Sequence, residues 1–171
     1  MHGCLAPPIW WGLTMGSPLA AFVIDYPPAK LFPNSVQRRA YNGNTALTRK
    51  LEATYVGKVR EQVREQLRLL SQPSLAERLS DAPRREAVFP LNQSLRLLMH
   101  FNRPKKGGRP DVDNLIAASK RALDVFTTEG VWRDDGLIQE LHGKLVAVAR
   151  DDQPSLEIFI YPLDNLTLGV V

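Results

Sequence analysis

The chain has 171 residues and a formal net charge of +4; 44% of its residues are hydrophobic and 23% are charged. This is the composition of an ordinary globular protein, so it excludes wholesale disorder, collagen-like repeats and coiled coils. The length predicts a single domain. Prolines interrupt the most apolar region, near the N-terminus, and no apolar run approaches the roughly 18 residues that a membrane span needs. We therefore expect no membrane insertion.

The first 19 residues are predicted to form a loosely ordered leader, and residues 20–171 a single domain. Met15 offers an alternative start, and the leader lacks the positively charged region that begins a secretory signal. The single cysteine, Cys4, lies in this leader, which argues against a disulfide framework and a Cys-based zinc site. A reducing cytoplasm is the expected location.

The first half of the domain predicts one strand and one long helix. Residues 20–26, AAFVIDY, are β-branched and aromatic and stop at Pro27-Pro28, which predicts a strand entering a rigid turn. Residues 45–70 place apolar side chains at steps of three and four, which predicts a helix. Its Arg- and Glu-rich face is expected to be solvated and held by ion pairs, or in part to follow a phosphate backbone. The predicted apolar face comprises Val56, Val59, Val63, Leu67 and Leu70.

An irregular connector, a strand and a second helix are predicted next. Residues 71–90 are rich in Pro, Ser and charge and predict the connector, whereas residues 94–101 predict the strand. The second helix opens beside Asp111 and runs to about Phe126, with Gly130 placed to end it. Its inward-facing residues are predicted to be Leu115, Ala118, Ala122, Leu123 and Phe126.

Two more strands are predicted near the C-terminus, at residues 137–149 and 155–161. A DDQP turn joins them. The order β, α, β, α, β, β predicts an α+β fold in which two main helices pack on a small mixed sheet. The pattern contains no internal repeat and no sign of a second domain.

Charge is distributed unevenly along the chain. Residues 1–110 carry 17 Lys and Arg against 7 Asp and Glu, whereas residues 111–171 carry 5 against 11. The two parts have net charges of +10 and −6, and the sign changes between Arg109 and Asp111. This asymmetry suggests a basic surface for a polyanion beside an acidic cluster with another task. The alternative is that the charges intermix on a solvated surface.

Three aspartates form the candidate chemical centre. Asp111 and Asp113 lie two residues apart at the helix start, and Asp135 lies in the turn after that helix. A return of the chain would bring Asp135 beside the pair, where three carboxylates repel one another unless a cation neutralises them. Oxygen ligands alone favour Mg²⁺ or Mn²⁺, ions that typically act in phosphoryl chemistry. The alternatives are a helix cap at Asp111 or Asp113 and an ordinary turn at residues 134–136.

A basic loop precedes the aspartate pair. The segment NRPKKGGRP places its cations around Gly107-Gly108. A nuclease needs cations beside a carboxylate-metal site, because they neutralise the phosphates that flank the one being hydrolysed. The alternative is a mobile surface loop without a ligand. The candidate DNA-binding residues are Arg103, Lys105, Lys106 and Arg109.

The segment RPDVDNLIAASKRALDVFTTEGVWRDDGLI, residues 109–138, resembles the signature of the RusA family of Holliday-junction resolvases. That signature is an Asp-x-Asp-Asn-Leu helix start followed by an aromatic-x-Asp-Asp turn. The element order over residues 20–162 is also similar to that of the family. Its members are small homodimeric, Mg²⁺-dependent endonucleases, common in phages and prophages, that nick two strands of a four-way DNA junction symmetrically.

The resemblance implies a role for five residues of this chain. The metal ligands would be Asp111, Asp113 and Asp135. Asp134 would support the turn, and Asn114 would brace the helix start. These roles come from the matched positions of the family signature.

One position departs from the family pattern. Ala117 stands where family members usually carry a Lys, four residues after Asp113. The nearest cation on that helix is Lys120, about 10 Å from Asp113 along the helix axis. If the family Lys stabilises charge in the transition state, Lys120 or a loop cation takes its place here, or catalysis is slowed or impaired.

These observations predict a Mg²⁺-dependent endodeoxyribonuclease that resolves four-way junctions as a homodimer during DNA recombination and repair. A branched-DNA-binding protein without catalysis is the first alternative. A glycosyl- or nucleotidyl-transferase that uses Asp-x-Asp is the second. The sequence has no Walker-type loop and no GxGxxG, so no nucleotide cofactor is expected. The predicted catalytic residues are Asp111, Asp113, Asp135 and Lys120.

Overall fold

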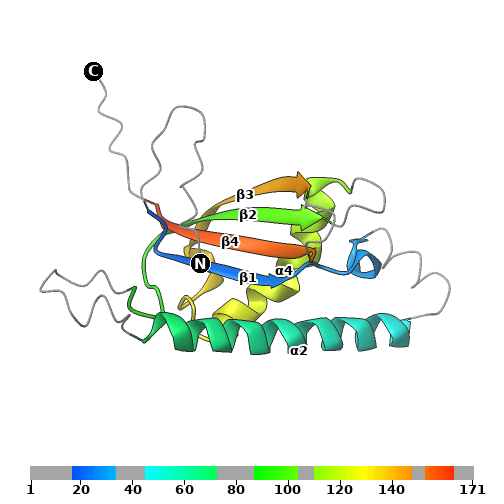
Figure 1. Cartoon of the computed structure of the whole chain (residues 1–171), viewed down its shortest axis with the longest axis horizontal. Coiled ribbons are helices and arrows are strands. Elements are labelled where there is room, and N and C mark those ends of the chain that lie inside the picture. Colours follow the sequence, from blue (N-terminus) through cyan, green and yellow to red (C-terminus); the bar gives the residue numbers. More distant parts are fainter. Residues whose placement is uncertain (1–16, 34–44, 73–86, 104–109, 148–152, 164–171) are drawn as a thin grey trace, which may run out of the picture.

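The computed structural model is shown in Figure 1. It describes residues 17–33, 45–72, 87–103, 110–147 and 153–163. These residues form a four-stranded mixed sheet with two long helices and two short 3-10 helices. The predicted α+β fold is confirmed. Most of the predicted leader lies outside the described residues.

The sheet has the strand order β1-β4-β2-β3. The four strands are β1 (Ala20–Asp25), β2 (Leu95–Arg103), β3 (Ile138–Ala147) and β4 (Ser155–Pro162). β4 pairs antiparallel with both of its neighbours, whereas β2 and β3 pair in parallel. As a result, the C-terminal ends of β1, β2 and β3 all lie at the same end of the sheet (Figure 1). The predicted strands are confirmed to within two residues wherever the chain is described.

The two long helices have different positions relative to the sheet. α4 (Val112–Thr128) joins the parallel strands β2 and β3 as a crossover and packs against β3. α2 (Thr45–Leu70) lies along β1 and contacts α4 (Figure 1). The short 3-10 helices are η1 (Ala29–Leu31) and η2 (Asp135–Leu137). In the part of the chain that the structure describes, no helix has the length and apolarity needed to cross a membrane.

The core lies between the helices and one face of the sheet. Alternate residues of β2 and β4 are fully buried there, because successive side chains of a strand point to opposite faces. All five residues of α4 that were predicted to face inward belong to this core or pack against it. The largest fully buried side chains include Trp132, Phe22, Phe101, Phe126 and Met99.

The apolar face of α2 differs in part from the prediction. Val59 and Val63 are fully buried as expected, but Leu70 is 45% exposed. Leu70 is the last residue of the helix, and periodicity sets only the direction of a side chain, not what lies opposite it. Tyr55 is buried instead, and its hydroxyl donates a hydrogen bond to the carbonyl oxygen of Asp25 at 3.2 Å.

Two glutamines of α2 cover the free edge of β1. Gln66 accepts a hydrogen bond from Val23 N at 2.8 Å and donates one to Val23 O at 2.7 Å. Gln62 accepts from Asp25 N at 3.0 Å and donates to Asp25 Oδ1 at 2.7 Å. These bonds satisfy polar groups that an edge strand otherwise leaves open to pairing with another chain. α2 thus takes the place of a neighbouring strand.

α4 ends in a Schellman motif at Gly130, as predicted. Gly130 has a φ of 76°, which a residue without Cβ adopts at little cost. Val131 N donates to Phe126 O at 2.9 Å, and Gly130 N donates to Thr127 O at 3.2 Å. These two bonds define the motif, and both Val131 and Phe126 are fully buried beside it.

Replacing Gly130 by alanine is expected to lower the free energy of unfolding by about 1 kcal/mol, because a positive φ is strained in a residue with a Cβ. Gly57→Ala is the matched control. It lies inside α2, its added methyl group meets nothing within 4 Å, and it should raise the same quantity by about 0.5–1 kcal/mol. Urea unfolding measures both effects. Changes of the same sign would contradict this description.

Candidate functional site

The first aspartate pair lies at the start of α4. Asp111 is the N-cap residue, with φ −70° and ψ 140°, and its carbonyl oxygen accepts a hydrogen bond from Leu115 N at 3.2 Å. Its carboxylate makes no capping hydrogen bond. Asp113 lies in the first turn, and both aspartates are exposed. The capping alternative therefore does not account for the Asp111 carboxylate, which is available to a ligand at the positive end of the helix dipole.

Close packing against β3 fixes this end of α4. A Cβ atom at Gly143 would lie 2.7 Å from Cγ1 of Val112 and 2.9 Å from Cδ1 of Ile116. A glycine at this point of the strand lets the first turn of α4 approach the sheet. Val112 thus faces the sheet, and the two aspartates that flank it are exposed. A glycine inside a predicted strand is a known signal of close approach, so the sequence contained this information.

The turn after α4 is fixed by a buried tryptophan. Trp132 is fully buried and stacks on Phe126 with ring centroids 5.2 Å apart. Its Nε1 donates a hydrogen bond to Oγ1 of Thr127 at 2.7 Å. On either side of it, the main chain pairs with Leu91: Leu91 N donates to Val131 O at 2.9 Å, and Arg133 N donates to Leu91 O at 3.0 Å. The turn therefore has a defined position relative to the core.

The two aspartates of this turn have different environments. Oδ1 of Asp134 accepts a hydrogen bond from Gly136 N at 2.7 Å, which stabilises the start of η2. Asp135 is the first residue of η2 and is exposed. Its carboxylate makes no hydrogen bond or ion pair to another described residue. Asp134 is thus engaged in the turn, whereas no described residue engages the Asp135 carboxylate.

The aspartate pair and Asp135 lie at opposite ends of α4 (Figure 1). The axial rise from Asp113 to Thr128 is about 22 Å, and η2 follows beyond that end of the helix. In the described part of the chain, no three His, Cys, Asp or Glu side chains form a group that can hold a metal ion. The expected return of Asp135 to the pair within one chain is therefore not met. A crossover between parallel strands carries the chain back across the whole sheet before the next strand begins.

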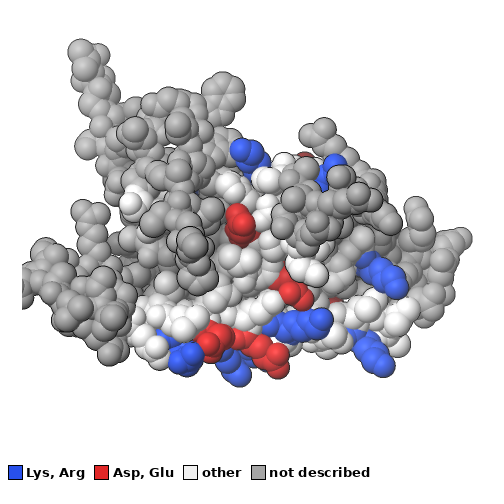
Figure 2. Space-filling view, viewed as in Figure 1, with Lys and Arg blue, Asp and Glu red and all other residues white. Residues whose placement is uncertain are grey.

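The arginines in the second half of α2 are neutralised by acidic neighbours. Both Arg60 and Arg64 approach the Glu129 carboxylate, at 3.1 and 2.6 Å, and the Glu129 side chain is only 10% exposed. Arg68 pairs with Glu65 at 2.7 Å. Figure 2 shows the resulting mixture of basic and acidic side chains along α2. These ion pairs favour the prediction that this face is solvated and ion-paired over the alternative that it follows a phosphate backbone.

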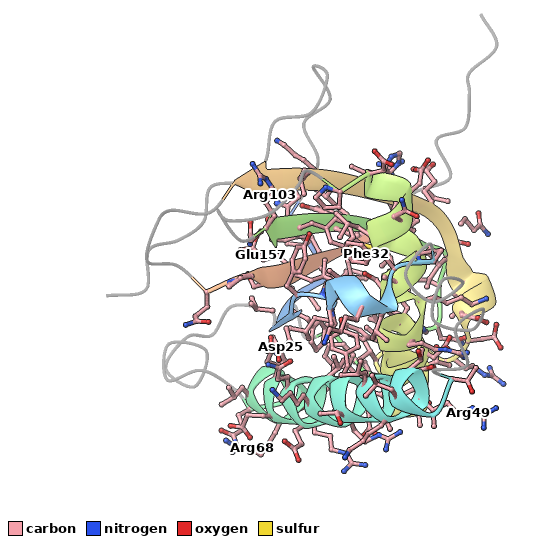
Figure 3. All side chains as sticks on the ribbon, turned by 90° about the vertical axis from the view of Figure 1, so that its right-hand side faces the viewer. Asp25, Phe32, Arg49, Arg68, Arg103 and Glu157 are labelled. Carbon is pink, nitrogen blue, oxygen red and sulfur yellow. The ribbon has the colours of Figure 1, made fainter. Side chains whose placement is uncertain are left out.

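Only one of the four predicted DNA-binding residues lies in the described part of the chain. Arg103 is the half-buried last residue of β2. It lies at the end of the sheet that faces the viewer in Figure 3. Burial raises the pKa of the nearby Tyr26 hydroxyl, and the charge of Arg103 opposes that rise. α4 begins at this same end of the sheet (Figure 1), so Arg103 and the aspartate pair lie at one end of the molecule's sheet. Outside the described residues lie Lys105, Lys106 and Arg109.

Lys120 lies on the same exposed side of α4 as the aspartate pair. Asp113, Ala117 and Lys120 are all exposed and follow one another at steps of four and three. The neighbouring Arg121 is engaged by Glu52 at 2.7 Å. Lys120 has no such acidic partner among the described residues, so its ammonium group is available to a ligand. Asn114, predicted to brace the helix start, is half-buried in the first turn.

Comparison of the chain with protein-family models and with curated proteins finds no match. The chemistry must therefore be argued from the residues. Asp111, Asp113 and Asp135 provide only oxygen ligands, which suit a hard divalent cation. Their side chains are exposed, and no described neighbour engages them. The donor set fits Mg²⁺ in its chemistry, but a single chain supplies it in two separate parts.

Asp134→Ala is expected to lower the free energy of unfolding by about 1 kcal/mol, because it removes the acceptor for Gly136 N. Asp135→Ala should change it by less than about 0.5 kcal/mol, since that carboxylate makes no hydrogen bond to a described neighbour. Chemical denaturation of the two variants compares them directly. If Asp135→Ala were the more damaging substitution, the roles assigned to the two aspartates would be reversed.

Proposed function

We propose that the protein is a Mg²⁺-dependent endodeoxyribonuclease that resolves four-way DNA junctions as a homodimer in the cytoplasm. The observation that carries this proposal is the set of exposed carboxylates at both ends of α4, which the described fold does not use for itself. The resemblance of residues 109–138 to the RusA signature supplies the substrate class. Arg103, at the end of the sheet where α4 begins, adds a cation suited to a DNA phosphate.

A homodimer overcomes the separation imposed by α4. A two-fold arrangement that sets the η2 turn of one copy against the first turn of α4 in the other brings Asp135 of one chain to Asp111 and Asp113 of its partner. Symmetry then creates two equivalent sites. Two sites facing two related phosphodiesters suit paired nicks in a four-way junction.

The acidic residues and the basic residues have different proposed roles in hydrolysis. Asp111, Asp113 and the partner's Asp135 would hold the cation, whose chemistry is Lewis-acid stabilisation of the charge that develops on the scissile phosphate. Arg103 and Lys120 neutralise flanking phosphates and hold the backbone in place. In the hydrolysis, a water molecule gives up one proton as its oxygen bonds to phosphorus, one phosphorus–oxygen ester bond breaks, and the departing oxygen takes up a proton, so the net proton count is unchanged.

A branched-DNA-binding protein without catalysis is the second candidate function. Ala117 favours it, because this exposed position next to the aspartate pair carries no charge where the RusA family usually has a Lys. The three available carboxylates favour the nuclease. DNA binding without hydrolysis in Mg²⁺ or Mn²⁺ would decide for the second candidate.

The wild-type protein is expected to make paired nicks in a synthetic four-way junction in Mg²⁺ and none in EDTA. Asp113→Asn should reduce nicking by on the order of 100-fold or more, because it removes a negative ligand, while junction binding is retained. Asp124→Asn, a change of the same type further along α4, should nick normally. Gel analysis of end-labelled junctions measures nicking. Equal activity of Asp113→Asn and wild type would refute the proposal.

Mixed dimers test the contribution of both chains to one site. Neither the Asp113→Asn nor the Asp135→Asn homodimer should nick. A dimer with one chain of each kind should recover activity, because one of its two sites combines wild-type Asp113 from one chain with wild-type Asp135 from the other. Differently tagged chains can be co-expressed and purified as mixed dimers. Inactivity of the mixed dimers, with active wild-type controls, would place all three aspartates of a site in one chain.

A further inference from the structure

Arg133 is held at a fixed position in the turn that carries Asp135. Its main-chain N–H donates to Leu91 O at 3.0 Å, and the preceding Trp132 is fully buried against Phe126. The side chain of Arg133 is nevertheless exposed. The core thus fixes the main chain here and leaves the guanidinium group in solvent.

The Arg133 guanidinium has no acidic partner among the described residues, in contrast to most of the helix arginines. Arg64 is paired with Glu129 and Arg121 with Glu52. The carboxylate nearest to Arg133 along the chain belongs to Asp134, which accepts from Gly136 N. The planar guanidinium fork matches the oxygen atoms of a phosphate, and no described carboxylate pairs with it.

Arg133 and Asp135 lie two residues apart in the same turn, so a contact that brings one of them to a partner brings the other with it. Two residues of extended chain span about 7 Å, which is within the range of an arginine side chain. In a site built from two chains, Arg133 arrives with Asp135 opposite the first turn of the partner's α4. That first turn contains no basic residue, and Lys120 lies about 10 Å from Asp113 along the helix axis.

We propose that Arg133 binds a DNA phosphate beside the scissile phosphodiester and that it reaches the site from the partner chain, together with Asp135. This inference rests on the proposed nuclease function and on its two-chain site. In this proposal, the η2 turn of one chain supplies Asp135 to bind the cation and Arg133 to bind the DNA. The guanidinium N–H groups donate to non-bridging phosphate oxygens, and no bond to Arg133 forms or breaks in the reaction.

Junction binding in EDTA tests the phosphate contact without any activity. Arg133→Ala should weaken binding and reduce the slope of log K against log salt concentration by about one ion. Arg133→Lys should keep most of the slope but bind more weakly than wild type, because Lys lacks the bidentate fork. Arg68→Ala, at the far end of α2, is the control and should leave the slope unchanged. Fluorescence anisotropy at several salt concentrations measures these values, and thermal unfolding shows that each variant is folded.

Mixed dimers test the chain from which Arg133 acts. In a dimer of Asp113→Asn and Asp135→Asn chains, the intact site takes Asp135 from the Asp113→Asn chain. Arg133→Ala in that same chain should reduce nicking by on the order of 10-fold or more. Arg133→Ala in the Asp135→Asn chain should have no effect on the intact site.

Each outcome decides a different part of the proposal. Equal losses for the two placements of Arg133→Ala, or a larger loss in the Asp135→Asn chain, would overturn delivery from the partner. An unchanged salt slope for Arg133→Ala would overturn the phosphate contact. Failure of the wild-type protein to nick in Mg²⁺ would overturn the nuclease function alone, and the salt slope would still decide whether Arg133 contacts phosphate.

Discussion

A crossover helix of fixed length separates the two acidic parts of this protein. α4 spans 17 residues, and both of its ends are tied to the sheet or the core: the first turn packs on Gly143, and the last turn closes at Gly130 above the buried Trp132. The rise of about 22 Å from Asp113 to Thr128 is therefore a property of the main chain and not of side-chain rotamers. For this reason a site that joins Asp111, Asp113 and Asp135 around one cation is proposed to draw on two chains.

The basic residues that give the first part of the sequence its positive charge do not form one broad surface in the described structure. The strongly basic first part of the chain suggested a broad surface for a polyanion, but Arg60, Arg64 and Arg68 of α2 are engaged by acidic side chains, above all by the nearly buried Glu129. Two further described cations lie near the ends of α4: Arg103 is at the end of the sheet where α4 begins, and Arg133 is just beyond the last turn of α4. Binding and hydrolysis are thus proposed for the same two ends of one helix.

Local features were predictable from the sequence, and long-range ones were not. Periodicity and the stop signal at Gly130 predicted α2 and the end of α4, because both depend on residues close in sequence. The exposure of Leu70 and the edge-covering role of Gln62 and Gln66 depend on what lies opposite α2. The position of Asp135 depends on parallel pairing of β2 and β3, a contact between distant segments. The candidate ligands were therefore predicted as residues but not as an assembled site.

The most direct measurement is anomalous diffraction from crystals of the protein grown with Mn²⁺, an ion with the same preference for oxygen ligands as Mg²⁺. The two-chain site predicts an anomalous peak in contact with Asp111 and Asp113 of one chain and Asp135 of its two-fold partner. A peak held by all three aspartates of a single chain would contradict the separation of the two ends of α4. A peak on other residues would contradict the assignment of the ligands.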